Sequence, residues 1–112
     1  MSLDCEIYDV NSNKIYSSLN GLGWVVVRYL HDKEYVSKED IEKSSYTVKL
    51  SRAIILEITN ELIKYFNNES SYYRDYEIDE ASNLGYVLGF LYQLSIFTKD
   101  NENPEIYLDA NW

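Results

Sequence analysis

Hydrophobic and polar residues alternate near both ends of the chain. Residues 3–8 read Leu-Asp-Cys-Glu-Ile-Tyr, and residues 105–109 read Glu-Ile-Tyr-Leu-Asp. Strict alternation over five or six residues is typical of a β-strand with one buried face. We therefore predict a strand at each end of the chain. A polar, Asn-rich stretch follows the first strand, and residues 14–16 then continue it as a short hairpin.

Two longer segments have helical spacing. The first, Ser51–Asn67, has one apolar stripe and one polar side. The stripe consists of Ile54, Ile55, Ile58, Leu62, Tyr65 and Phe66, and the polar side consists of Arg52, Glu57, Asn60, Glu61 and Lys64. The second runs from Glu80 to about Thr98, with Asp79 as its N-cap and Lys99 at its end.

Three shorter segments are less distinct. Residues 19–30 have the β-branched and aromatic content of a strand, but their leucines also fall at helical spacing, and we favour a helix. A short helix is expected near residues 37–41, with Ser37 as its cap and Asp40 at the capping-box position. Residues 46–50 alternate and fit either a short strand or the lead-in to the next helix.

These elements predict an α+β fold. The terminal strands form a small sheet that packs against two or three helices. With 112 residues, 46% of them hydrophobic, the chain suits one domain over residues 1–112, and we find neither a linker nor a repeat.

The chain shows no targeting or membrane signal. Its longest apolar stretch, residues 84–97, is too short to span a bilayer, and no signal peptide opens the sequence. The one cysteine permits no internal disulfide bond. We expect a cytoplasmic protein without membrane contact.

The charge balance disfavours direct binding to nucleic acid. The chain has 19 acidic and 10 basic residues, a net charge of −9, whereas phosphate contacts need Lys and Arg. Residues 65–112 hold nine acids and two bases, so the excess lies mainly in this second half. Such a field attracts basic partners. The alternative is that acidity only keeps the protein in solution.

A stretch between the two helices combines tyrosines, serines, one arginine and carboxylates, as binding surfaces do. We predict that its carboxylates supply charge and its tyrosines supply contact area to a partner. The predicted partner-binding residues are Tyr72, Tyr73, Asp75, Tyr76, Glu77, Asp79 and Glu80. The alternative is a solvated acidic linker whose tyrosines lie against the core.

Three small residues, Ala81, Gly85 and Gly89, follow one line of the second helix. Glycine inside a helix costs about 1 kcal/mol relative to alanine, so a packing reason is plausible. We expect this line to receive the 51–67 helix. The alternative is a seam between two copies in a homodimer.

The sequence offers little catalytic chemistry. Cys5 and His31 are each the only residue of their kind, and they could form a thiol–base pair only if the fold joined them. Two such ligands cannot complete a zinc site, and the acidic clusters lack the glycine of a calcium loop. Gly21-Leu22-Gly23 lacks the third glycine and the basic residue of a phosphate loop. We predict no catalytic residue, metal or cofactor.

Two stretches resemble phage proteins. Met1-Ser2-Leu3-Asp4-Cys5-Glu6-Ile7-Tyr8, followed by Asn20-Gly21-Leu22, resembles a family of small uncharacterised bacteriophage proteins that end in a strand like Pro104-Glu105-Ile106-Tyr107-Leu108. That family's His-Asn-Leu stretch reads Leu19-Asn20-Gly21 here. Tyr46-Thr47-Val48-Lys49-Leu50-Ser51 is similar to a hexapeptide in a small acidic phage inhibitor of Cas9. The resemblance implies a phage or mobile-element origin, and therefore the cytoplasm of a bacterial host cell as the location. It assigns no functional residue.

Together these observations favour a small non-enzymatic inhibitor. It would bind a basic protein that handles nucleic acid, such as a nuclease, in the manner of phage anti-defence or anti-CRISPR inhibitors or of toxin-immunity proteins. The alternatives are a homo-oligomeric structural or accessory protein and a small-molecule-binding domain.

Overall fold

The computed structural model describes residues 3–10, 14–73, 81–100 and 105–112. It divides into two compact units. One comprises Met1–Leu50 with Pro104–Trp112, and the other comprises Ser51–Asn103. The expectation of one domain stays a prediction, because a compact unit within a chain need not fold alone.

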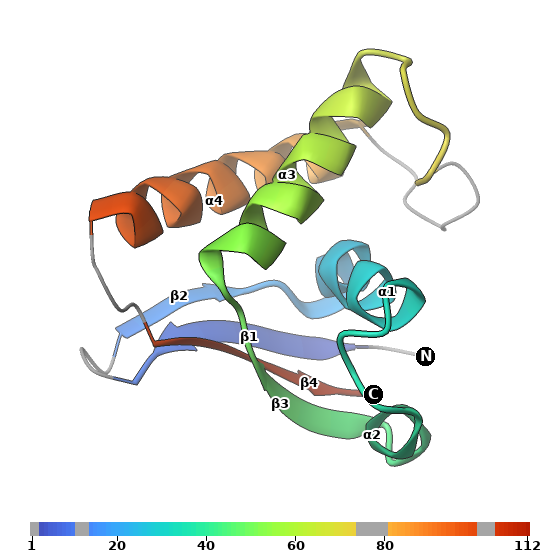
Figure 1. Ribbon diagram of the computed structural model, residues 1–112, viewed down its shortest axis with the longest axis vertical. Helices are drawn as coiled ribbons and strands as arrows, with labels where there is room; N and C mark the ends of the chain where they lie inside the picture. The colour runs from blue at the N-terminus through green and yellow to red at the C-terminus, as the bar shows by residue number, and fades with distance from the viewer. Residues whose placement is uncertain (1–2, 11–13, 74–80, 101–104) are drawn as a thin grey trace. The chain divides into compact units, whose positions relative to one another are not determined.

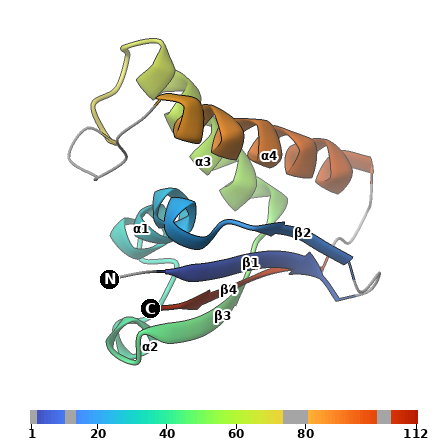
Figure 2. The same cartoon turned by 180° about the vertical axis from the view of Figure 1, so that it is seen from behind.

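The first unit contains a four-stranded antiparallel sheet (Figures 1 and 2). Its strands, in the order β2-β1-β4-β3, are β1 Asp4–Asp9, β2 Lys14–Ser18, β3 Ser45–Lys49 and β4 Ile106–Asn111. The two ends of the chain pair directly, with Asp4 opposite Asn111 and Asp9 opposite Ile106. This confirms the α+β class, the hairpin between β1 and β2, and the strands predicted at the two termini.

The segment 19–30 is helical, as we favoured. A 3₁₀ turn, η1 Asn20–Gly23, leads into α1 Trp24–Asp32, which buries three consecutive valines with Tyr29 and Leu30. Both views show α1 on one side of the sheet (Figures 1 and 2). A Cβ placed on Gly23 would lie 2.5 Å from the Cβ of Cys5, so this glycine lets the start of α1 approach β1.

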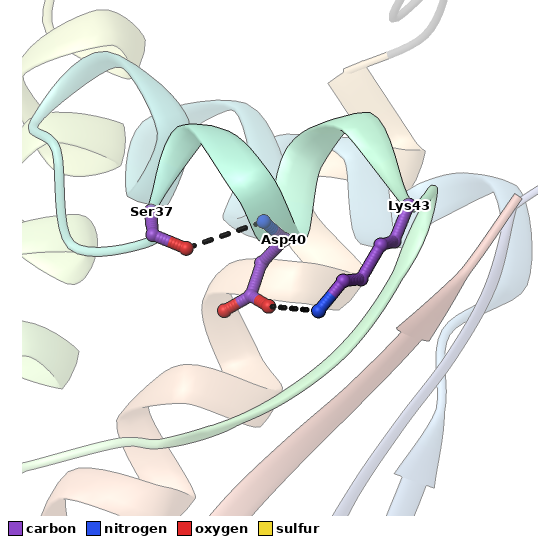
Figure 3. A network of polar contacts seen from close by, with 3 residues as sticks. All are labelled: Ser37, Asp40 and Lys43. Atoms are coloured by element: carbon purple, nitrogen blue, oxygen red, sulfur yellow. Dashed lines mark hydrogen bonds and ion pairs between the residues drawn. The ribbon is translucent and has the colours of Figure 1, made fainter.

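The short helix α2, Lys38–Glu42, forms where Ser37 can cap it. Ser37 Oγ accepts a hydrogen bond from the backbone N–H of Asp40 at 3.2 Å (Figure 3). The Asp40 carboxylate also lies 3.9 Å from Lys43 Nζ, one turn further along. Residues 45–49 then form β3, which resolves the ambiguity of this segment in favour of a strand.

The second unit consists of two long helices that pack side by side, α3 Arg52–Phe66 and α4 Ala81–Asp100 (Figures 1 and 2). Ser51 caps α3 by accepting the N–H of Ile54 at 3.2 Å. The predicted apolar stripe is buried at Ile55, Ile58 and Leu62. The prediction is wrong for Phe66. This residue is the last of the helix, and its side chain is 36% exposed.

The described residues hold four α-helices rather than two or three, since the short α1 and α2 form beside the two long ones. None of the helices in this part of the chain is both long and apolar enough to cross a membrane.

Candidate functional site

The structure describes only two of the seven predicted partner-binding residues. Asp75, Tyr76, Glu77, Asp79 and Glu80 lie outside the described residues, and their predicted role stays a prediction. Tyr72 is half-buried, and Ser70 Oγ accepts its backbone N–H at 3.2 Å.

Tyr73 does not present a contact surface. Its side chain is 1% exposed, and its ring meets those of Tyr72 and Tyr65 edge-on, with centroids 4.9 Å and 6.1 Å away. Its assignment to partner binding is therefore wrong. The physical reason is that a tyrosine ring carries a large apolar area, and the ring of Tyr73 buries this area against neighbouring rings of the same chain.

The small-residue line on α4 does not receive α3. Gly85 and Gly89 are exposed, and a Cβ added at either one would meet nothing within 4 Å. The expectation that α3 packs there is wrong at these two positions. Instead, α4 buries Val87, Leu91 and Leu94. The side chain of Ala81 lies outside the described ones, and the alternative of a dimer seam stays a prediction.

The surface that combines carboxylates with tyrosines is the face of the sheet that points away from α1. We call it the acidic sheet face. Residues at alternate positions of three strands form it, and all are exposed or half-buried. They are Asp4, Glu6 and Tyr8 of β1, Tyr107, Asp109 and Asn111 of β4, and Ser45, Thr47 and Lys49 of β3. The opposite face buries Cys5, Ile7, Tyr46, Leu108 and Ala110.

Strand register orders these side chains in three rows. Asp4, Asn111 and Ser45 form one row, and Glu6, Asp109 and Thr47 form the next. The third row contains Tyr8, Tyr107 and Lys49. Neighbouring strands are about 4.8 Å apart and alternate residues about 7 Å apart, so the face is a regular grid of polar groups.

Asp109 is the centre of the hydrogen bonds on this face. Its Oδ1 accepts one bond from Tyr8 Oη at 3.1 Å and another from Thr47 Oγ1 at 2.5 Å. Burial, the hydrogen bond to Asp109 and the charge of that carboxylate together raise the pKa of Tyr8, so the hydroxyl stays protonated and donating. Tyr8 also stacks on Tyr107, with ring centroids 6.0 Å apart and planes at 24°. The hydrogen bond of Tyr8 and the stacking of the two rings thus hold these tyrosines in place on the face.

One pairing on the face is unfavourable for folding. Glu6 lies directly opposite Asp109 on the neighbouring strand, and like charges at opposite positions of antiparallel strands destabilise a sheet. The lysine of this face lies in the adjacent row, opposite Tyr107.

The residues considered for catalysis lie elsewhere. Cys5 is fully buried on the opposite face, and burial, reinforced by the charges of Asp109 and Glu6, raises the pKa of its thiol to about 12. His31 Nε2 lies 2.8 Å from the hydroxyl of Tyr46, and burial lowers the pKa of the imidazole. A thiol with such a pKa is not an activated nucleophile at neutral pH.

His31 and Tyr46 belong to an aromatic cluster within the first unit. The ring of Trp112 lies 5.5 Å from that of His31 and 5.7 Å from that of Tyr46, and Trp24 meets Trp112 edge-on at 5.6 Å. The cluster therefore joins α1 and β3 to the end of the chain. Among the residues that the structure describes, no group of three or more His, Cys, Asp or Glu is placed to hold a metal ion.

Sequence reasoning missed the acidic sheet face, although its signal was present. The alternation in residues 3–8 and 105–109 puts Asp4, Glu6 and Tyr8 on one face of β1, and Tyr107 and Asp109 on one face of β4. What a single sequence does not provide is the register that places Glu6 beside Asp109. No family model, no curated protein and no solved structure matches this chain.

Proposed function

We propose that this protein is a non-catalytic binding protein that presents the acidic sheet face to a basic protein partner. The partner class is a protein whose cationic surface otherwise binds nucleic acid, and the bound chain blocks that surface. The observation that carries the proposal is Glu6 opposite Asp109, beside the stacked Tyr8 and Tyr107. A cationic partner relieves the repulsion between the two carboxylates, so the pair favours the bound state over the free protein.

The chemistry of the face suits arginine-rich surfaces. Exposed Asp4 and Glu6 alternate on β1, with their side chains about 7 Å apart, and each can accept a bidentate pair of bonds from a guanidinium. Tyr8 and Tyr107 offer flat amphipathic rings, on which a guanidinium or an apolar side chain can lie at little entropic cost. The face thus supplies both steering charge and contact area.

The net charge of −9 supports the same partner class. It repels nucleic acid and draws proteins that bind nucleic acid. A protein that acts in this way fits the description of a phage anti-defence or anti-CRISPR inhibitor and equally that of a toxin-immunity protein. We place the chain in this functional class as part of the proposal.

A binding titration with a defined cationic probe tests the proposal. The probe is a fluorescein-labelled octa-arginine peptide, and the readout is its anisotropy at low and at moderate salt. We expect Asp4→Lys/Glu6→Lys to weaken binding about tenfold, because each exposed ion pair contributes up to about 1 kcal/mol and the reversal adds repulsion. The same peptide, loaded with a labelled single-stranded oligonucleotide, should release the oligonucleotide when the wild-type chain is added.

The matched control is Glu39→Lys/Glu42→Lys on α2, whose two carboxylates are also exposed. Both double variants change the net charge by the same amount. If the control weakens binding as much as the sheet variant does, only net charge matters and the acidic sheet face is not the binding site. Failure of the wild-type chain to release the oligonucleotide contradicts the blocking role.

A further inference from the structure

The strand β3 lies at the edge of the sheet and pairs with β4 on one side only (Figure 1). Its register with β4 is regular along its whole length. Just before this register begins, Trp112 N–H donates to the carbonyl of Ser44 at 3.0 Å. Just after it ends, Leu50 N–H donates to the carbonyl of Ile106 at 2.8 Å. In an antiparallel pair, residues whose backbone groups point to the neighbouring strand alternate with residues whose groups point away from it.

The N–H and C=O groups of Ser45, Thr47 and Lys49 therefore point away from β4, to the open edge of the sheet. All three residues are exposed. Among the residues that the structure describes, no strand, loop or turn pairs with these backbone groups. An edge of this kind can accept one more strand from another protein, because any extended backbone offers matching donors and acceptors.

We propose that an extended segment of the basic partner adds to β3 as a fifth strand of the sheet. This mode of binding rests on the proposed function and brings the partner onto the acidic sheet face. Alternate side chains of an added strand lie on that face, next to those of Ser45, Thr47 and Lys49. The net charge of −9 favours a basic segment and opposes a second copy of the chain at this edge.

The side chains of β3 specify the residues of such a segment. Opposite Thr47, a long basic side chain extends over the threonine toward Asp109, which accepts the threonine hydroxyl. Opposite Lys49, an acidic residue is favoured, because lysine on an edge strand repels a basic one. On the other face of β3, the half-buried Val48 favours an apolar neighbour. The segment thus alternates charged and apolar residues, with its acidic residue beside Lys49.

A peptide with and without a backbone methyl group tests strand addition on the unaltered full chain. The peptide contains glutamate, valine, arginine, valine, arginine and lysine, in that order, with blocked ends. In an antiparallel register its glutamate lies opposite Lys49 and its first arginine lies opposite Thr47. Titration followed by amide NMR signals of the isotope-labelled chain gives the affinity. We expect the N–H signals of Ser45, Thr47 and Lys49 to shift, because each of these groups gains a hydrogen bond.

Methylating the backbone nitrogen of the first arginine, which faces Thr47, should weaken binding about tenfold. The matched control carries the methyl group on the second valine, whose N–H points away from β3, and it should bind like the unmodified peptide.

Equal affinities of the two methylated peptides, or no shift of the three amide signals, overturn strand addition. The proposed function survives either result if octa-arginine still requires Asp4 and Glu6, and without that requirement both proposals fail. If the three signals broaden with protein concentration in the absence of peptide, a second copy occupies the edge, which also overturns the proposal.

Discussion

At the scale of single residues, Gly23 is a position where the close approach of Cys5 and Leu3 leaves no room for a side chain. A methyl group at this position would lie 2.5 Å from the Cβ and 2.9 Å from the Sγ of Cys5, and 3.1 Å from Leu3. The φ of Gly23 is −61°, which any residue can adopt, so the clash alone decides the effect. We predict that Gly23→Ala lowers the free energy of unfolding by about 1–3 kcal/mol, measured by urea denaturation.

The same substitution at Gly85 is the control. Gly85 lies on an exposed helix face with open space around it, so Gly85→Ala should raise the free energy of unfolding by up to about 1 kcal/mol. Opposite signs for the two variants, measured at a concentration where the chain is monomeric, support the structural reason. Equal effects would show that neither depends on local space. Sequence reasoning treated Gly21-Leu22-Gly23 only as a failed phosphate loop, because packing distances are not visible in a sequence.

At the scale of elements, the pairing of β1 with β4 carries a conflict between stability and function. Replacing Glu6 by threonine removes the repulsion with Asp109 and introduces a residue that favours strands. We predict that Glu6→Thr raises the free energy of unfolding by about 0.5 kcal/mol and weakens the binding of octa-arginine. Urea denaturation and the anisotropy titration measure the two effects.

The control for this prediction is Asp4→Thr, on the same strand. Asp4 faces the uncharged Asn111, so its replacement changes strand propensity without relieving a repulsion. A larger gain for Glu6→Thr than for Asp4→Thr isolates the effect of the like-charge pair. Equal gains would mean that Asp109 does not repel Glu6 and would remove the main support for the proposed function.

Most elements were predictable because their signals are local. Ser37 caps the helix that follows it, as predicted, and Ser51 caps α3 through the same kind of hydrogen bond. The candidate site was not predictable in the same way. Tyr73 and Tyr8 are both tyrosines next to charged residues, yet one is buried and the other lies on the open face of the sheet. Contacts made after the chain folds back on itself, rather than neighbours in sequence, decide which of them can meet a partner.

At the scale of the whole molecule, the two compact units differ in their spectroscopic probes. Both tryptophans, Trp24 and Trp112, belong to the first unit, whereas the longest helices, α3 and α4, belong to the second. Tryptophan fluorescence therefore reports on the first unit, and far-ultraviolet circular dichroism reports mainly on the second. Coincident unfolding transitions are the signature of a single cooperative domain.

His31 makes the first unit sensitive to pH. Histidine in an unfolded chain has a pKa of 6.5, and burial lowers the pKa of His31 in the fold, although the charge of Asp32 raises it and that of Arg28 lowers it further. Below about pH 6.5 the unfolded chain therefore binds the proton first, and the free energy of unfolding falls as the pH falls. We predict that the thermal midpoint seen by tryptophan fluorescence decreases between pH 7.5 and pH 5.5.

The variant His31→Gln keeps a side chain that can bond the Tyr46 hydroxyl but does not titrate, so its midpoint should be less dependent on pH. If the chain is one cooperative domain, the midpoint seen by circular dichroism decreases with that seen by fluorescence, although α3 and α4 lie in the other unit. A shift in fluorescence alone would show two independently unfolding units. His31 is the only histidine in the chain. An equal pH dependence in His31→Gln and the wild type would therefore show that a group other than histidine causes it.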